Sequence, residues 1–416
     1  MKTLAELSAI REKMKNKINV LRSIIALALV IASLLSLSSC LFDSDIYWEI
    51  IENGGLGDGN QSGEADEIIA SGFLPGSGSA STENVSPLQK TMLSTVLIVS
   101  NFAIPSAGSG VIYKVDRESG DAYVITNYHV IFDESYGVCQ DIDVYLYGMV
   151  RKGYEIKATL LGGSINYDIA VLKISESEVL KNSYATAATF SDSDNVQIFD
   201  TVYTVGNAEG EGFSACRGII SVESEYIDII GAAGDLIQLR VIRTDAAINL
   251  GNSGGGLYNE DGGLIGIACA KKGSSEVDNI GYAIPSNLVF NIVENIIDHC
   301  DGVNMTQLNR PLLGVYLSST TSGVVVDPES GRISIVEIVR ITEVGDGAAE
   351  NILAVDDVIK SVAIDDKTIE ITRTYQVPDF LISARIGSVI TIVVERAGEI
   401  KSFDFTVTSE MISLEK

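Results

Sequence analysis

The chain has 416 residues, of which 46% are apolar and 20% are charged, so it is long enough for two or three domains and can bury a sizeable core. Its formal net charge of −27 argues against binding to nucleic acid, because a phosphate backbone requires a clustered basic face. Residues 1–40 carry six Lys or Arg and two Asp or Glu, whereas the rest of the chain carries 23 basic and 54 acidic residues. The basic residues 1–40 and the acidic remainder of the chain are therefore expected to occupy different environments.

A basic N-terminal segment precedes an uncharged apolar run. Four basic residues between positions 13 and 22 are followed by the uncharged run Ser23–Phe42, an order that is typical of a secretory signal. Within that run, Leu37-Ser38-Ser39-Cys40 resembles a bacterial lipobox, which predicts lipidation of Cys40. The alternative is an uncleaved helical anchor, because the run just reaches the roughly 20 apolar residues that span a bilayer. In both cases residues 1–40 tether the rest of the chain to a membrane, outside the cytoplasm in the bacterial cell envelope.

Residues 41–87 have the composition of a flexible acidic tether. Between positions 43 and 85 the chain carries nine Asp or Glu and no Lys or Arg, and Gly, Ser and Asn dominate. Such a segment buries too little apolar surface to offset its ordering entropy, and its charges repel one another. The alternative is that Trp48 and the pair Ile50-Ile51 contact the membrane surface or the next domain.

Residues 88–300 are expected to form a mainly β domain. Short segments rich in Val, Ile, Thr and Tyr alternate with Gly, Asp, Asn and Ser turns, which favours a β-sandwich or barrel. The expected strands include Thr95–Val99, Gly110–Lys114, Ala122–Thr126, Val144–Tyr147, Ile169–Ile174, Thr201–Val205, Leu236–Arg243 and Gly263–Ala268. One helix is expected to open the region at Leu88–Ser94, and another to close it at Ser286–Cys300 with Ser286 as its N-cap.

Four cysteines follow the lipobox-like segment, at Cys139, Cys216, Cys269 and Cys300. Outside the cytoplasm they would allow two disulfides with three possible connectivities. Four buried free thiols are the alternative, which is slightly favoured. Because no Cys-x-x-C or Cys/His spacing is present, no metal site is predicted.

Only two histidines occur in the chain, and their settings differ. His129 ends an apolar strand, whereas His299 lies beside the end of the closing helix, where a histidine commonly serves as a favourable charge. If the chain uses a histidine base, His129 is therefore the candidate. Asp168 opens the apolar strand that follows it. Taken alone, a strand-end histidine and a turn aspartate both have a structural explanation.

The segment Gly251-Asn252-Ser253-Gly254-Gly255-Gly256 is the most informative motif. A serine nucleophile needs an exposed hydroxyl and a backbone that approaches the substrate closely, and flanking glycines permit the tight turn that provides both. The amides of Gly251 and Ser253 can then converge on one point and bind a developing oxyanion. For this motif alone, a plain glycine-rich turn is the alternative.

In combination these motifs resemble the HtrA (DegP-like) serine proteases over roughly residues 90–300. The resemblance is carried by Gly108-Ser109-Gly110-Val111-Ile112, Thr126-Asn127-Tyr128-His129-Val130, Tyr167-Asp168-Ile169-Ala170-Val171-Leu172-Lys173, Thr244-Asp245-Ala246-Ala247-Ile248-Asn249, Gly251-Asn252-Ser253-Gly254-Gly255 and Gly281-Tyr282-Ala283-Ile284-Pro285-Ser286-Asn287. It implies a chymotrypsin-like pair of six-stranded β-barrels and a serine endopeptidase with the triad His129, Asp168 and Ser253. It also implies that no metal or organic cofactor is needed, and that the protein is a homo-oligomer, a trimer by analogy.

Four positions near the serine turn bear on how well it matches the family. Leu250 stands where Pro is common and Gly256 where Pro or a small apolar residue is common, and both changes are expected to loosen the turn. Ile248 and Lys271 fall where the family lines the pocket for the residue before the scissile bond. Lys271 would lay its stem on the pocket wall with its charge outward, favour a polar or acidic substrate residue, or be solvated on a shifted loop.

The C-terminal part of the chain resembles the PDZ domain that follows the protease in this family. Residues 301–310 are expected to be a hinge, residues 311–408 the PDZ domain and residues 409–416 a tail. A small antiparallel sheet with a short helix near Val377–Ala384 is expected, and Phe403–Val407 alternates as an edge strand does.

A peptide-binding loop is implied at the start of that domain. Amides around Leu312, Leu313 and Gly314 would bind the terminal carboxylate of an extended peptide that adds to the sheet as a strand, with Gly314 permitting the close approach. The alternative is that this segment is only the start of a strand. Asp356-Asp357 stands where such domains often carry Gly-Asp.

The resemblance favours a membrane-tethered endopeptidase that cleaves unfolded or damaged proteins and recognises peptide C-termini. Regulated cleavage of one dedicated signalling substrate is a second hypothesis. A catalytically inert peptide-binding protein is a third, because the altered Leu250 and Gly256 would permit a collapsed oxyanion turn.

Overall fold

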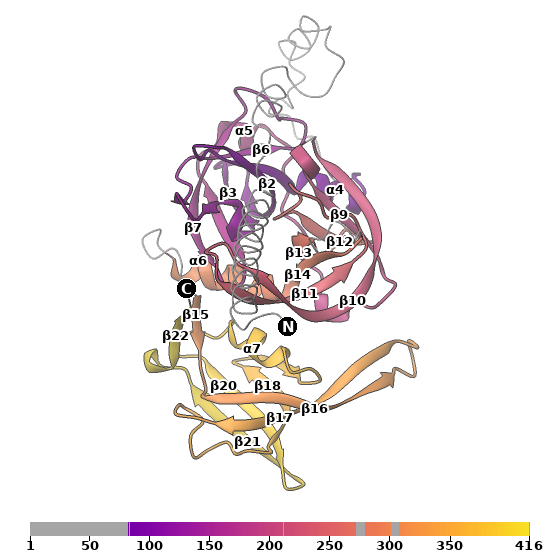
Figure 1. The fold of residues 1–416 in the computed structure, drawn as a ribbon, viewed down its shortest axis with the longest axis vertical. Helices are drawn as coiled ribbons and strands as arrows, with labels where there is room; N and C mark the ends of the chain where they lie inside the picture. The colour runs from indigo at the N-terminus through magenta and orange to yellow at the C-terminus, as the bar shows by residue number, and fades with distance from the viewer. Residues whose placement is uncertain (1–81, 83, 211, 272–278, 301–307, 416) are drawn as a thin grey trace, which may run out of the picture.

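The computed structural model describes residues 82, 84–210, 212–271, 279–300 and 308–415. The expected signal or anchor, Cys40 and nearly all of the acidic tether lie outside these residues. Within the described ranges, no helix has the length and apolar character needed to cross a bilayer. The described chain forms two closed six-stranded barrels and, below them in Figure 1, a C-terminal sheet.

The first barrel follows the short helix α4 (Pro87–Leu93), whose N-terminus is capped by the Ser86 side chain. Its strands, in their order around the barrel, are β1 (Thr95–Ser100), β2 (Ser106–Asp116), β3 (Asp121–Thr126), β8 (Ile169–Ile174), β7 (Ile156–Ser164) and β6 (Ile142–Leu146). Smaller elements beside it are η2 (Tyr128–Val130), β4 (Phe132–Asp133), β5 (Gly137–Val138) and α5 (Glu178–Lys181). Over the first five residues of β7 the side chains alternate between core and solvent, which is the pattern that a strand with one buried face requires, and its last three residues are all buried.

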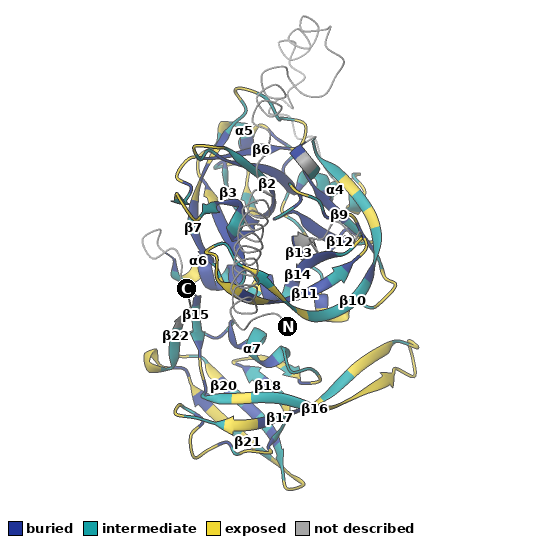
Figure 2. Ribbon diagram, in the orientation of Figure 1, coloured by how far each residue is buried: buried dark blue, intermediate teal, exposed yellow. Residues whose placement is uncertain are grey.

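The second barrel also has six strands, and a helix follows its last strand in the sequence. Its strands, in order, are β10 (Ser214–Ile230), β11 (Leu236–Thr244), β14 (Gly281–Pro285), β13 (Leu264–Lys271), β12 (Gly256–Asn259) and β9 (Thr201–Gly206), with η3 (Ser193–Asn195) and η4 (Ala208–Gly210) in its loops. Figure 2 shows β12 and β14 as largely buried, whereas the long β10 is mostly intermediate or exposed. The expectation of a mainly β fold with a chymotrypsin-like pair of barrels is confirmed.

The closing helix α6 (Ser286–His299) begins one residue earlier than expected. Pro285 occupies the N-cap position, and the predicted cap Ser286 is instead the first helical residue. Its Oγ donates to the carbonyl of Ser191 at 2.6 Å, so its side chain ties the helix to the preceding loop. The prediction of Ser286 as the N-cap was therefore wrong. Its hydroxyl donates to the Ser191 carbonyl and caps no helical amide.

None of the four cysteines that the structure describes takes part in a disulfide. Cys139, Cys269 and Cys300 are buried, and Cys216 is half-buried. The alternative of buried thiols without disulfides therefore agrees with Cys139, Cys269 and Cys300, whereas Cys216 is not buried.

The C-terminal domain contains one main antiparallel sheet and one small one. The main sheet has the order β16 (Val315–Val326), β17 (Ile333–Val344), β18 (Val358–Ile364), β20 (Val389–Arg396) and β21 (Glu399–Thr406), with β19 (Lys367–Glu370) paired to β18. The helix α7 (Gln376–Leu381) packs on it, and β21 is an edge strand as predicted.

The segments expected to be a hinge and a tail are partly structured. Leu308–Pro311 forms β15, which pairs with β22 (Ile412–Glu415) after the short η5 (Ser409–Met411). Leu308 is fully buried. The end of the expected hinge and the expected tail therefore form a two-stranded sheet together, and residues 301–307 lie outside the description.

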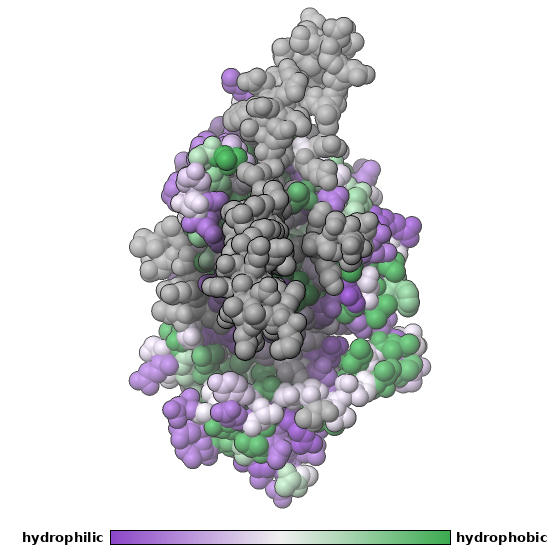
Figure 3. All heavy atoms as spheres, viewed as in Figure 1, coloured by the Kyte–Doolittle hydropathy of each residue, from purple (hydrophilic) through white to green (hydrophobic). Residues whose placement is uncertain are grey.

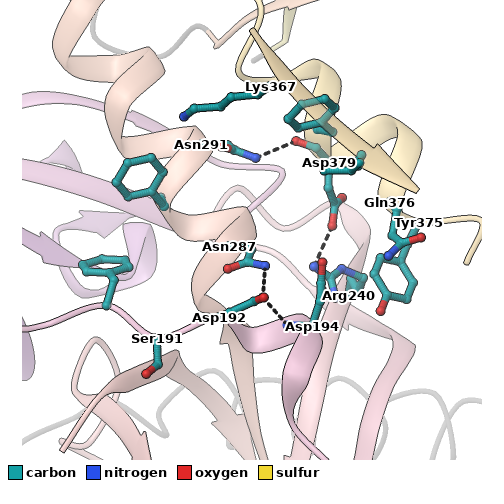
Figure 4. A pocket seen from close by; sticks show the side chains of 14 residues that line it. Ser191, Asp192, Asp194, Arg240, Asn287, Asn291, Lys367, Tyr375, Gln376 and Asp379 are labelled. Carbon is teal, nitrogen blue, oxygen red and sulfur yellow. Dashed lines mark hydrogen bonds and ion pairs between the residues drawn. The ribbon is translucent and has the colours of Figure 1, made fainter. Parts of the chain in front are cut away.

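Helix α7 docks the C-terminal domain against α6 and β11 (Figure 4). Arg240 Nη2 of β11 lies 2.6 Å from Asp379 Oδ2 of α7, and only 3% of the Arg240 side chain is exposed. Burial raises the pKa of the Asp379 carboxyl, and the attraction of Arg240 opposes that rise without cancelling it. Asn291 Nδ2 donates to the Asp379 carbonyl at 3.0 Å, beside a cavity of about 360 Å³. Removing one partner of such a buried pair typically costs about 3–5 kcal/mol, because the other charge is left buried and unpaired.

The long β16–β17 hairpin carries apolar side chains at its tip, where Figure 3 shows hydrophobic residues gathered. Val324, Val326 and Ile333 are all exposed there. The tip also reaches the second barrel, since Gln197 Nε2 donates to the carbonyl of Ile333 at 2.9 Å.

Candidate active site

His129 and Asp168 are paired at the ends of two neighbouring strands. His129 Nδ1 lies 2.8 Å from Asp168 Oδ2, and the His129 backbone amide donates to Asp168 Oδ1 at 3.0 Å. One carboxylate therefore contacts both the ring and the backbone of the histidine. Because an ionised carboxylate can only accept, the proton at this contact belongs to Nδ1, and Nε2 is left as the basic nitrogen.

The sheet explains why these two residues meet. Strand β3, which leads to His129, pairs antiparallel with β8, which begins directly after Asp168, and Thr126 lies opposite Ala170. The short helix η2 then carries His129 back over the start of β8. Asp168 adopts a left-handed backbone with φ 51°, a conformation that aspartate tolerates better than most residues.

The surroundings of the pair favour the protonated form of the His129 ring. Asp168 is 3% exposed, while 26% of the His129 side chain remains accessible. Burial alone would lower the pKa of His129, but the charge of Asp168 and its hydrogen bond outweigh burial and raise that pKa above the ordinary 6.5. The site therefore stabilises an imidazolium when one forms.

Ser253 is the second residue of the second of two consecutive tight turns, which share Asn252. The first runs from Asn249 to Asn252, and the second from Asn252 to Gly255, with closing N–H···O distances of 3.0 and 2.8 Å. Each turn has a glycine with positive φ at its third position, 88° at Gly251 and 83° at Gly254. A side chain is strongly disfavoured at that position of a type II turn, which explains why the glycines flank the serine.

The serine turn packs directly on the strand motifs. Ser109 of β2 donates its backbone N–H to the Ser253 carbonyl at 2.8 Å. A Cβ added to the neighbouring Gly108 would lie 2.7 Å from the Val130 methyls and 3.2 Å from the Ser253 carbonyl oxygen. The residue after His129 and the backbone of Ser253 therefore both lie against the same glycine, and three motifs that are distant in sequence converge.

The serine turn is flanked by Leu250 and by Gly256, which lies against the Tyr258 ring. Among the described residues, the amides of Gly251 and Ser253 donate to no protein acceptor. A side chain at Gly256 would overlap the ring of the fully buried Tyr258, so the glycine at this position makes room for packing. Whether Gly256 also loosens the turn stays a prediction. Leu250 is 43% exposed.

Ile248, which was predicted to be a wall of the specificity pocket, packs against β14. It is buried, and a Cβ on Gly281 of β14 would lie 2.9 Å from Ile248 Cδ1. Gly281 pairs with Lys271 at the end of β13, so the two sequence-predicted wall positions are near each other. The side chain of Lys271 lies outside the described part of the chain.

The expected carboxylate-binding loop is partly occupied by the chain itself. The Leu312 amide donates to the carbonyl of Met411 at 2.8 Å, so this amide is not available to a peptide. Gly314 has φ 79°, and a Cβ there would lie 2.7 Å from the Asp346 carbonyl. The close approach that Gly314 permits is therefore that of the 345–347 loop. Leu313 is buried.

Three buried side chains that the sequence did not single out also shape the site. Asn127 Nδ2 donates to the Asp168 carbonyl at 2.9 Å, Thr126 Oγ1 donates to the Ser109 carbonyl at 2.7 Å, and Ser109 Oγ donates to the Gly251 carbonyl at 2.6 Å. Their signal in the sequence is a polar residue inside an otherwise apolar strand motif. Such a residue must find a hydrogen-bond partner once it is buried.

Comparison with known proteins agrees with this geometry. The family model for the trypsin-like peptidase domain matches residues 108–267. The serine protease Do-like HtrA of Lactococcus lactis subsp. cremoris (strain MG1363) is 37% identical over 298 residues, which are 65% of this chain and 68% of the relative. The periplasmic pH-dependent serine endoprotease DegQ of Escherichia coli (strain K12) is 36% identical over 212 residues, which are 50% and 40% of the two chains. A solved structure of the HtrA-type protease AlgW with a tripeptide matches with a TM-score of 0.51 and 28% identity, covering 79% of this chain and 96% of that one.

Proposed function

The chain belongs to the HtrA family of serine proteases, and from that premise we propose that His129, Asp168 and Ser253 are its catalytic triad. The protein is a serine endopeptidase with a trypsin-like domain. The observation that carries the residue assignment is the 2.8 Å contact between His129 Nδ1 and Asp168 Oδ2. That contact leaves Nε2 as the base in a site where the Ser253 turn packs against the same strands.

The reaction proceeds by two acyl-transfer steps. His129 Nε2 takes the proton of the Ser253 hydroxyl as it attacks the scissile carbonyl, and returns it to the leaving amine, which leaves an acyl-enzyme. Water then attacks the ester by the same proton route. Asp168 holds the ring in the required tautomer and stabilises its charged form. The Gly251 and Ser253 amides stabilise the oxyanion of each tetrahedral intermediate.

The substrates that we propose are unfolded or damaged proteins, and incubation with reduced, unfolded casein tests this. A general protease is expected to digest casein to small peptides without any added activator. An intact casein band that is cleaved only after an activating peptide is added would instead support the dedicated signalling protease. Intact casein under both conditions would contradict the proposal.

The C-terminal domain is proposed to be a PDZ domain that captures peptide C-termini. Support comes from β16, which lies at an edge of the main sheet and directly follows the Leu313-Gly314 segment. An extended peptide can add to this edge as another strand, with its carboxylate at the amides of Leu313 and Gly314.

A matched pair of peptides tests this capture. A decapeptide with a free C-terminus is expected to bind the full chain roughly 10–100-fold more tightly than the same peptide with an amidated end, because charge-assisted hydrogen bonds to the carboxylate are lost. Fluorescence anisotropy measures both dissociation constants. Equal affinities would remove the carboxylate from the recognition mechanism.

We further propose that the protein works outside the cytoplasm, tethered by residues 1–40, and that it assembles as a homotrimer. The tether rests on the basic and apolar pattern of that segment and on its lipobox-like Cys40. The DegQ relative, which is named periplasmic, favours the same side of the membrane. The trimer rests on analogy with the family.

A further inference from the structure

The hydroxyl of Ser109 connects the serine turn to the end of a strand in the second barrel. Ser109 lies in β2 of the first barrel and is fully buried. Its Oγ donates to the Gly251 carbonyl at 2.6 Å and accepts from the Asn207 backbone amide at 2.9 Å. Asn207 directly follows β9. One side chain therefore joins three segments that are far apart in the sequence.

The direction of these two hydrogen bonds is fixed. A hydroxyl carries one proton, and an amide N–H can only donate, so the Asn207 amide leaves the Ser109 proton for the Gly251 carbonyl. Asn207 is held in turn, because its Oδ1 accepts from the Gly212 amide at 2.8 Å. The Gly251 carbonyl thus meets a donor that is already oriented before any substrate arrives.

The backbone of Ser109 also forms a hydrogen bond to the serine turn. Its N–H donates to the Ser253 carbonyl at 2.8 Å, so Ser109 binds the carbonyls of both residues whose amides are assigned to the oxyanion hole. The side-chain contact acts on the peptide plane between Gly251 and Asn252. That plane lies between the two peptide groups that carry the Gly251 and Ser253 amides. A rotation of it would turn at least one of those donors away from the substrate.

We propose that Ser109 is a positioning residue, whose hydroxyl holds the serine turn in the conformation that aims the Gly251 and Ser253 amides at the oxyanion. It touches no reacting atom and acts through Gly251. The proposal rests on the assignment of Ser253 as nucleophile and deepens it. Leu250 stands where the family commonly has the more rigid proline, so this chain relies on tertiary contacts such as the Ser109 bond to hold Gly251 in place.

Replacing Ser109 with Ala tests the proposal through a property that general destabilisation does not change. A peptide aldehyde becomes tetrahedral on Ser253 and uses the oxyanion hole, whereas the matching peptide alcohol binds the cleft without becoming tetrahedral. For Ser109→Ala we expect kcat and the affinity for the aldehyde to fall together by roughly 10–100-fold. This decrease is no larger than the one caused by removing a whole oxyanion donor. KM and the affinity for the alcohol should stay within about threefold of the wild type.

Ser183→Ala is the matched control. Ser183 is also buried, and its Oγ likewise donates to a carbonyl, that of Leu180 at 2.7 Å, and accepts an amide, that of Ala185 at 3.2 Å. It lies beside α5, and its two hydrogen bonds stay within that region of the first barrel. The control should lose comparable stability and keep both inhibitor affinities.

Two results would overturn the proposal. One is a Ser109→Ala enzyme with the kcat and aldehyde affinity of Ser183→Ala, and the other is an equal loss of aldehyde and alcohol binding. If Ser109→Ala does not fold, Ser109→Cys retains a weak donor at the same place, and its aldehyde affinity should fall by a smaller factor while alcohol binding is kept. Unchanged aldehyde binding in a folded Ser109→Cys would also count against it. A Ser253→Ala protein with wild-type activity would instead contradict the triad assignment itself.

Discussion

Replacing Ser253 with Ala should lower kcat for a peptide substrate by about 10⁶-fold, because the reaction loses its nucleophile and its acyl-enzyme route. Binding of the substrate should change little, since Ser253 is assigned to chemistry and the rest of the cleft is unaltered. Hydrolysis of a fluorogenic peptide by equal concentrations of the two proteins measures the effect.

The fold should survive this substitution. Ser253 contacts the first barrel through its carbonyl, which accepts from the Ser109 amide, and alanine retains that carbonyl. The melting temperature of Ser253→Ala should therefore lie close to that of the wild type. A folded Ser253→Ala protein that still cleaves the peptide at the wild-type rate would show that the nucleophile is elsewhere.

Replacing Asp168 with Asn should lower kcat by roughly 10⁴-fold, because the imidazole loses the carboxylate that fixes its tautomer and stabilises its charged form. The pH profile should change as well. His129 must be neutral to act as a base, and its pKa lies above 6.5 in the folded protein, so the acidic limb of kcat/KM in the wild type should have its midpoint above pH 6.5. In Asp168→Asn the effect of burial remains without the opposing charge, and the midpoint should move to lower pH.

The free energy of unfolding of the wild type should depend on pH through the same raised pKa of His129. A raised pKa favours the protonated histidine in the folded state, so this contribution is complete below pH 6.5 and is lost as the pH rises through the folded-state pKa. Asp143→Asn is a suitable control for Asp168→Asn, because Asp143 is another buried carboxylate of the first barrel, paired with Lys157 at 2.7 Å. An acidic limb that stays at the wild-type midpoint in Asp168→Asn would contradict the role assigned to this carboxylate.

The fold and the main site motifs were predictable because their signals are local. Short segments rich in Val, Ile, Thr and Tyr between turn residues indicate strands, and the expected strand Ile169–Ile174 coincides with β8. The glycines around Ser253 predicted a tight turn, and the structure shows positive φ at Gly251 and Gly254. Both inferences depend only on neighbours within a few residues.

The features that could not be predicted depend on contacts between distant segments. The close approach of the Tyr258 ring to Gly256 could not be read from the turn motif. The Leu312 amide was expected to face a peptide, yet it bonds to Met411 because the end of the chain folds back as β22. Ser286 was expected to cap α6, yet its hydroxyl bonds to Ser191. In each case a local preference gave way to a tertiary partner that pattern alone does not identify.

The role of Ser109 is the clearest example of this limit. It was visible as part of a motif, but its function follows from where Gly251 and Asn207 lie, at sequence separations of 142 and 98 residues. A buried hydroxyl in an apolar strand signals that a partner exists. Only the three-dimensional structure identifies the partner as the turn that carries the nucleophile.

Active-site labelling with a fluorophosphonate probe, followed by mass spectrometry of the labelled peptide, tests the central claim most directly. The probe reacts with a serine hydroxyl only when a base activates it. We predict that the wild-type protein is labelled at Ser253 alone and that labelling is lost in His129→Ala. Labelling at another serine, or labelling of Ser253 that is unaffected by the loss of His129, would contradict the proposed triad.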